Sequence, residues 1–211
     1  LIVLLGQEAW ASYLSQEDTT LINVPAIFAM ASQNAIILPD ENTPSIDTWM
    51  PESIYFASDS LAQRIRGGIV YEYDIAGNIN LIKQLYPGTE NIALITDNSY
   101  GGVAMQANVR KEMTNHPDID LFILDGRTNT VYTILDQLRE LPHKTVLLIG
   151  TWRVDKNEGY SMRNATYAMM DAVPHMPTFS ISSVGLGYWA IGGVMPMYRP
   201  QGKELAHQAI N

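Results

Sequence analysis

Polar and aromatic side chains follow the apolar runs of this sequence at the points where strands would end. Those after residues 1–5 and 26–30 are Gln7, Glu8, Trp10, Ser32 and Gln33. Those after residues 91–96, 121–124 and 145–150 are Asn98, Ser99, Tyr100, Arg127, Thr151, Trp152 and Arg153. Amides and hydroxyls hydrogen-bond a polar molecule, indoles stack on it, and paired guanidinium groups clamp a carboxylate or phosphate. We therefore predict that these residues bind a small polar ligand, either a sugar or a carboxylate-like compound.

Each of these residues also has a simpler structural interpretation. Asn, Ser, Asp and Gly recur in the strand-end loops of any α/β protein because they suit turns. Asp97 and Ser99 are placed to cap the next helix, and Trp152 to pack on the surface. Arg127 and Arg153 are each close in sequence to an Asp with which they would pair. Both interpretations stay open at this point.

Catalytic signals are weak. The sequence has no G-x-S-x-G nucleophile elbow and no G-x-x-x-x-G-K-[ST] phosphate loop. Its four His are not spaced as metal-binding pairs, and we interpret them as exposed loop or helix-end residues. We expect no cofactor, no metal and no enzymatic activity in this part of the protein. The alternative from a different class is a small α/β hydrolase that uses Asp97 or Asp125 as a base.

The apolar runs are continuous blocks with helical segments between them. They cover residues 1–5, 26–30, 91–96, 121–124, 145–150 and 178–181, with a further short strand expected at 35–38. Helices are predicted over residues 74–86, 103–115, 129–141, 160–172 and 201–210. Continuous apolar strands alternating with helices indicate parallel sheets covered on both faces, a doubly wound α/β fold. In such folds ligands bind beyond the carboxyl ends of the strands.

Two kinds of segment interrupt this alternation. Residues 39–58 contain Pro39, Pro44 and Pro51, and we expect a long excursion with little regular structure. Residues 67–73 and 185–193 are rich in Gly and flanked by aromatic residues, which suits linkers that cross between two lobes. We therefore predict two α/β lobes joined by a hinge. Residues 1–70 and 190–211 form the N-terminal lobe, and residues 71–189 form the C-terminal lobe.

Composition excludes some partners. The chain of 211 residues has 13 Lys and Arg against 22 Asp and Glu, a net charge of −9, so it is poorly suited to bind nucleic acid. It has no Cys, which excludes a disulfide scaffold and a Cys-based metal site. No apolar run approaches the roughly 20 residues of a membrane-spanning helix. We expect any export signal or membrane anchor to lie outside these residues.

Several segments together resemble a known family. They are Gly6-Gln7-Glu8-Ala9-Trp10, Val24-Pro25-Ala26-Ile27-Phe28, Leu85-Tyr86-Pro87, Asn91-Ile92-Ala93-Leu94-Ile95, Gly150-Thr151-Trp152-Arg153 and Val184-Gly185-Leu186-Gly187. The chain resembles the type I periplasmic-binding-protein fold, in its branch of ABC-transporter substrate-binding-like proteins. Residues 71–110 and 150–193 are similar to the sensor domains of bacterial hybrid two-component histidine kinases.

The resemblance implies a fold and a function. In that family two lobes close on a ligand, so the first five binding residues named above would line one lobe and the other seven the second. Family members begin with a strand and a helix before the equivalent of residues 1–5, so the first lobe is expected to be truncated. The resemblance implies a periplasmic sensor domain of a membrane-anchored kinase, with a second copy of the chain as a candidate partner. Near the crossings, Tyr71, Tyr73, Tyr188 and Trp189 would either transmit the signal or pack at the hinge. The alternative within the class is a free periplasmic solute-binding protein of an ABC importer.

Overall fold

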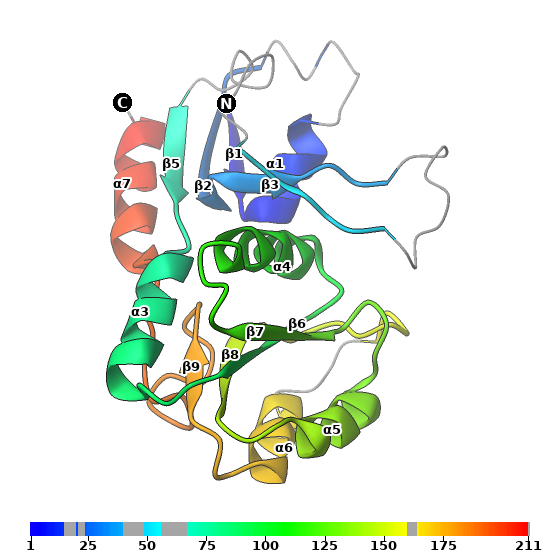
Figure 1. Ribbon diagram of the computed structural model, residues 1–211. Coiled ribbons are helices and arrows are strands. Elements are labelled where there is room, and N and C mark those ends of the chain that lie inside the picture. The colour runs from blue at the N-terminus through cyan, green and yellow to red at the C-terminus, as the bar shows by residue number, and fades with distance from the viewer. Residues whose placement is uncertain (15–19, 21–23, 40–48, 56–66, 160–163, 211) are drawn as a thin grey trace. The chain divides into compact units, whose positions relative to one another are not determined.

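The computed structural model describes residues 1–14, 20, 24–39, 49–55, 67–159 and 164–210 (Figure 1). Within this part the chain is α/β, with parallel sheets and helices, as predicted. It divides into two compact units. The first unit contains residues 1–35, 53–72 and 196–211, and the second contains residues 36–52 and 73–195. That these units are the lobes of a hinged pair remains a prediction.

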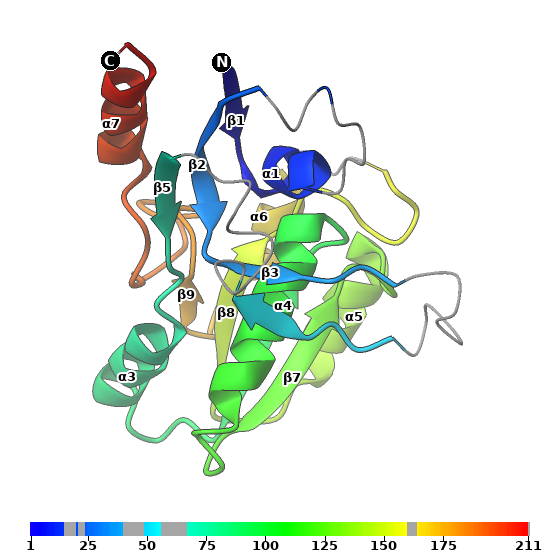
Figure 2. The same cartoon turned by 90° about the horizontal axis from the view of Figure 1, so that it is seen from above.

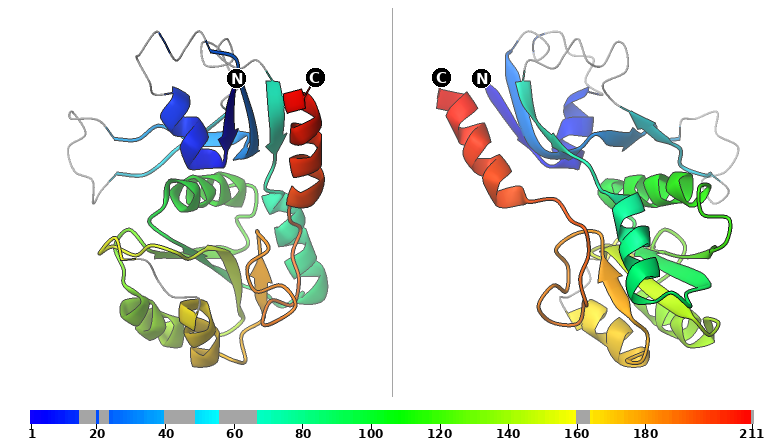
Figure 3. Two further views of the ribbon diagram at one scale, coloured as in Figure 1. Left: turned by 180° about the vertical axis from the view of Figure 1, so that it is seen from behind. Right: turned by 60° about the vertical axis from the view of Figure 1, so that its left-hand side comes forward.

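The first unit is built on a parallel sheet in the order β1-β2-β5. Its strands are β1 (Ile2–Leu5), β2 (Ala26–Ser32) and β5 (Gly67–Tyr71), and its helices are α1 (Gln7–Leu14) and α7 (Tyr198–Ile210). Alternate side chains of β2 point to opposite faces, so Phe28 packs on Trp10 of α1, whereas Ile27 and Ala29 pack on Leu205 of α7. Figure 3 shows α7 running beside β5 in both of its views.

The second unit has a four-stranded parallel sheet in the order β7-β6-β8-β9. Its strands are β6 (Asn91–Thr96), β7 (Asp120–Asp125), β8 (Thr145–Thr151) and β9 (Thr178–Ser180). The helices are α3 (Ile75–Leu85), α4 (Tyr100–Met113), α5 (Val131–Glu140) and α6 (Asn164–Ala172). From β6 the chain first adds β7 on one side and then crosses to add β8 on the other. The direction of winding therefore reverses between β6 and β8, which is a topological switch point.

Helices cover both faces of this sheet. Ile92 and Leu94 of β6 pack with α3 and α4, while Ala93 and Ile95 pack with α5 and α6. Figure 2 shows α4 in front of the sheet and α5 behind it. All four of these β6 side chains have no exposed surface, which explains why the strand is a continuous apolar block. Two short strands, β3 (Asn34–Ile36) and β4 (Ser53–Tyr55), form a separate two-stranded sheet.

One expectation about the irregular segments was wrong. Residues 67–71 form strand β5 instead of a linker, and Gly68 lies so close to Phe28 of β2 that a side chain there would collide with the ring. Part of the predicted excursion, residues 53–55, is strand β4, while residues 40–48 and 56–58 lie outside the described part. Helix α1 was not predicted, because its residues were read only as a strand-end loop.

The second Gly-rich segment packs against strand β9. Gly192 accepts a hydrogen bond from the Ser180 amide at 3.0 Å, and the Ile191 amide donates to the Thr178 carbonyl at 2.8 Å. The other predicted elements appear within two or three residues of their expected bounds, except that residues 160–163 of the expected helix 160–172 lie outside the described part.

Candidate functional site

Asp97 is the centre of the loops at the carboxyl edge of the second unit's sheet. It follows β6 directly and has no exposed surface. Its Oδ1 accepts hydrogen bonds from the Ser99 backbone N–H at 3.2 Å and the Ser99 hydroxyl at 2.6 Å. Its Oδ2 accepts from the Thr151 hydroxyl at 3.0 Å and the Arg153 backbone N–H at 2.7 Å. The carboxylate therefore joins the loops that follow β6 and β8, the two strands at the switch point.

The same two loops are joined a second time through the backbone. The Asn98 amide donates to the Val154 carbonyl at 2.9 Å. Two glycines make room for Asp97: a Cβ on Gly126 would lie 2.7 Å from the Asp97 Cα, and one on Gly102 would collide with its Oδ1. Because both loops are fixed at several backbone points, the positions of residues 98 and 153 are well defined.

Two side chains at this edge bond no other residue in the described part of the chain. Asn98 is half-buried and Arg153 is exposed, and neither side chain has a hydrogen bond or ion pair within the described residues. An amide with donor and acceptor atoms and a guanidinium with five donors thus flank the switch point. This pair can hydrogen-bond a polar or anionic molecule without breaking an existing interaction.

The guanidinium of Arg127, a predicted ligand-binding residue, already bonds other groups of the protein. Its Nε and Nη2 donate to the Asp125 carboxylate at 3.0 and 2.7 Å, its Nη2 reaches Gln106 Oε1 at 3.2 Å, and its Nη1 reaches the Trp49 carbonyl at 3.1 Å. The guanidinium carbon also lies 5.5 Å from the centre of the Trp49 ring. The Arg–Asp pairing interpretation is therefore the one that the structure confirms for Arg127, and ligand clamping by both Arg would require this pair to break.

The electrostatics of this pair favour the charged state. Burial acts to raise the pKa of Asp125, but the hydrogen bonds of Arg127 and Gln106 outweigh burial and hold the pKa below its ordinary value. Burial lowers the pKa of nearby Arg110, with Asp125 acting against that shift. Asp125 is thus an ionised structural anchor, not a proton acceptor near neutral pH.

The remaining predicted residues of the second unit serve the local structure. Ser99 caps α4, since its hydroxyl accepts from the Gly102 amide at 3.1 Å, and Thr151 donates to Asp97. The Tyr100 hydroxyl donates to the Ile36 carbonyl at 2.8 Å and accepts from the Ile36 amide at 3.1 Å, which fixes Ile36 to α4 within the second unit. Trp152 is only 6% exposed and belongs to the apolar cluster under α5 and α6.

Three of the predicted binding residues of the first unit, Gln7, Ser32 and Trp10, also bond or pack within the protein. Gln7 donates to the Asn34 carbonyl at 2.5 Å and accepts from the Ser32 amide at 3.1 Å. The Ser32 hydroxyl accepts from the Asn34 amide at 3.1 Å. Trp10 is 2% exposed and packs on Phe28 with the ring centres 5.9 Å apart. Glu8 is exposed, and the half-buried Gln33 side chain has no hydrogen bond within the described residues.

The aromatic residues proposed to transmit a signal lie in different surroundings. Tyr71 contacts Tyr198 edge-to-face, with ring centres 5.3 Å apart. Tyr73 packs against the core beside α3 and α4, and Trp189 against the core beside α5 and α6. Tyr188 is 80% exposed and contacts Tyr167 edge-to-face. Tyr73 and Trp189 therefore pack against the cores of the second unit, while hinge packing and a signalling role stay predictions.

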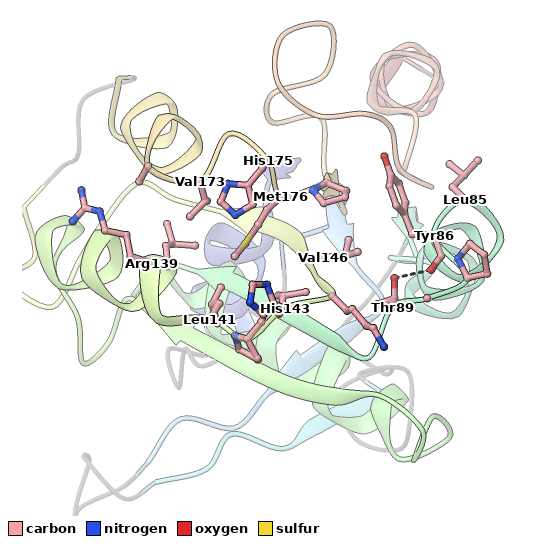
Figure 4. A pocket seen from close by; sticks show the side chains of 18 residues that line it. Leu85, Tyr86, Thr89, Arg139, Leu141, His143, Val146, Val173, His175 and Met176 are labelled. Atoms are coloured by element: carbon pink, nitrogen blue, oxygen red, sulfur yellow. Dashed lines mark hydrogen bonds between the residues drawn. The ribbon is translucent and has the colours of Figure 1, made fainter.

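Two of the hollows between described residues of the second unit are large enough to note, and neither was predicted. A pocket of about 380 Å³ beside the amino-terminal ends of α5 and α6 is lined by residues such as Thr130, Tyr132 and Asn157. A larger pocket of about 630 Å³ lies at the amino edge of the sheet, where α3, α5 and α6 end and β6, β8 and β9 begin (Figure 4). Sequence reasoning missed the larger one because it considered only the carboxyl ends of the strands. The available signal was a Pro after each of those helices, namely Pro87, Pro142 and Pro177.

Within the described residues, no group of three or more His, Asp or Glu side chains is arranged to hold a metal ion. Across residues 1–14, 20, 24–39, 49–55, 67–159 and 164–210, no helix combines the length and apolar character needed to span a bilayer.

Comparison with known proteins gave no relative: no protein-family model, no curated protein and no solved structure matches this chain.

Proposed function

We propose that this chain is the ligand-sensing domain of a two-component histidine kinase and binds a small polar molecule outside the cytoplasm. The sensor assignment rests on the family resemblance of the sequence. The single observation that supports ligand binding is the placement of Asn98 and Arg153 at the switch point. Neither side chain makes a hydrogen bond or ion pair with another described residue.

The proposed ligand carries a carboxylate or another compact anionic group. Arg153 supplies a planar fork of donors that matches a carboxylate, and Asn98 supplies one further donor and one acceptor. The hydrogen bonds from the Arg153 N–H to Asp97 and from the Asn98 N–H to the Val154 carbonyl keep both backbones fixed before the ligand arrives, which lowers the entropic cost of binding. In the two-lobe mechanism that we propose, Gln33 contributes from the first lobe, and the ligand favours the closed over the open arrangement because it makes more contacts in the closed one.

The hydrogen bonds of the two candidate bases support a binding function over hydrolysis. Both oxygens of Asp97 and both oxygens of Asp125 already accept hydrogen bonds from protein groups. A general base needs an oxygen within reach of a substrate proton. The importer alternative would use the same site, and the gene decides between the two: transmembrane and kinase segments after residue 211 support the sensor, and a stop codon there supports the importer.

The test is a thermal-shift screen with carboxylates, amino acids, sugars and nucleobases. A ligand at 100 times its Kd stabilises the folded state by about 2.7 kcal/mol, which corresponds to roughly 5–11 °C. We expect a carboxylate or amino acid to give such a shift in the parent chain and not in Arg153→Gln, while Arg199→Gln on exposed α7 keeps it. The absence of any shift across the screen would contradict the proposal.

A further inference from the structure

The larger pocket of the second unit combines an apolar interior with a basic rim. Leu141, Val146, Val173 and Met176 contribute apolar surface to it, and Arg139, His143, Lys144 and His175 are the basic side chains (Figure 4). No Asp or Glu of the described residues lines it, although the net charge of the chain is −9. The pocket therefore has basic side chains at its rim and no carboxylate among its lining residues.

The volume of this pocket and the basic side chains at its rim indicate which class of ligand would fit it. A volume of about 630 Å³ is in the range of ligand pockets and too large for isolated ions or a few waters. The two His side chains have no hydrogen bond or ion pair within the described residues. Arg139 and Lys144 form exposed ion pairs with Asp136 and Glu90, and exposed pairs of this kind contribute little and exchange readily. All four basic groups can therefore turn to an anionic ligand.

The helix ends determine which way such a ligand would lie. Helices α3, α5 and α6 end at the pocket, and the carboxyl end of a helix carries partial negative charge. Carbonyls near these ends are partly satisfied, since Tyr86, Leu141 and Val173 donate their amides to Ile82, Leu138 and Met170. An anionic group is thus favoured at the rim beside the basic side chains, with its apolar body toward Val146 and Met176.

We propose that this pocket is a second binding site, for an amphipathic organic anion with an apolar or aromatic body and one acidic group. It lies at the opposite edge of the sheet from Asn98 and Arg153, so the inference goes beyond the proposed function and does not depend on it.

The experiment uses two fluorescent probes of similar shape that differ in charge. They are 8-anilinonaphthalene-1-sulfonate, an anion, and N-phenyl-1-naphthylamine, which is neutral. The test variant is the double substitution Arg139→Gln with Lys144→Gln. Its matched control is Arg199→Gln with Lys203→Gln, which removes two exposed cations from α7 of the first unit.

We expect the anionic probe to bind one site per chain, and the test variant to weaken it at least about tenfold, which corresponds to about 1.4 kcal/mol. The neutral probe and the control variant are expected to change less than about twofold. Ala172→Trp, which places an indole in the pocket, is expected to abolish binding of both probes. Each of three results would overturn the proposal. The test and control variants could weaken binding of the anionic probe equally, or the test variant could lose both probes equally. The third such result is unchanged probe binding in Ala172→Trp.

Discussion

Replacing Asp97 with Asn tests whether this carboxylate organises the loops at the switch point. The substitution keeps the shape of the side chain and turns one acceptor oxygen into a donor. If the new amide nitrogen takes the Oδ2 position, the Arg153 N–H at 2.7 Å loses its acceptor. If it takes the Oδ1 position, the Ser99 N–H at 3.2 Å loses its acceptor. The hydroxyls of Ser99 and Thr151 can rotate, but a backbone N–H cannot.

The expected cost follows from that one lost acceptor. A buried donor without a partner costs about 1–3 kcal/mol, and hydrogen bonds to a charged acceptor are worth more than neutral ones. Removing the buried charge recovers some desolvation, so we expect a net loss of about 2–3 kcal/mol. For a chain of this size that corresponds to a fall in Tm of roughly 4–12 °C.

The assay is urea unfolding followed by tyrosine and tryptophan fluorescence, with Asp171→Asn as the matched control. Asp171 is exposed on α6 and has no hydrogen bond or ion pair within the described residues, so its substitution is expected to change stability by less than about 0.5 kcal/mol. Equal stabilities for Asp97→Asn and its control would refute the reasoning that Asp97 holds these loops together.

Three further predictions concern the same unit. Gly126→Ala should destabilise the fold by about 1–3 kcal/mol, because the new Cβ would lie 2.7 Å from the Asp97 Cα. Gly88→Ala is the control and should be nearly neutral, since no other atom lies within 4 Å of a Cβ placed there. Equal effects of the two substitutions in thermal unfolding would contradict this prediction. The lowered pKa of Asp125 means that its ion pair stabilises the fold above about pH 4 and is lost as pH falls through the folded-state pKa. Asp125→Asn should therefore flatten the loss of stability in acid, and an unchanged pH profile of unfolding would count against the pair. Tyr100→Phe removes the hydroxyl that bonds the backbone N–H and C=O of Ile36 and should lower the stability of the fold by about 1–3 kcal/mol. Tyr132→Phe is the control and should change stability little, because that ring is 79% exposed. Calorimetric melting of the two variants distinguishes these outcomes.

The fold class and most strands followed from the sequence because burial on both faces leaves a readable pattern. Residues 91–96 are a continuous buried run, and α3 ends just before Pro87 as its sequence indicates. Strand β5 was missed because Gly67 and Gly68 suggested a flexible crossing. In the structure Gly68 is needed for its close approach to Phe28, a contact between strands about 40 residues apart in sequence that no local pattern reveals.

The positions of the candidate site followed from the sequence, but the use of each side chain did not. Polar residues at strand ends were correctly expected to gather at one edge of the second unit's sheet. Whether Thr151 faces a ligand or Asp97 depends on which strands are neighbours, and that is set by the order β7-β6-β8-β9. Arg127 and Arg153 each follow a strand and lie two residues from an Asp, yet among the described residues only the guanidinium of Arg127 pairs with a carboxylate, whereas Arg153 bonds buried Asp97 through its backbone N–H.

The most direct test of the central claim is isothermal titration calorimetry of the best ligand from the screen against the parent chain, Asn98→Ala and Arg153→Gln. A charged hydrogen-bonding partner contributes about 1.5–3 kcal/mol, so the account predicts that Arg153→Gln weakens binding by at least about tenfold. Asn98→Ala should weaken it by about two- to tenfold, and Arg199→Gln should leave it unchanged. Binding of the same affinity in the parent chain and in Arg153→Gln would contradict a ligand site at the switch point.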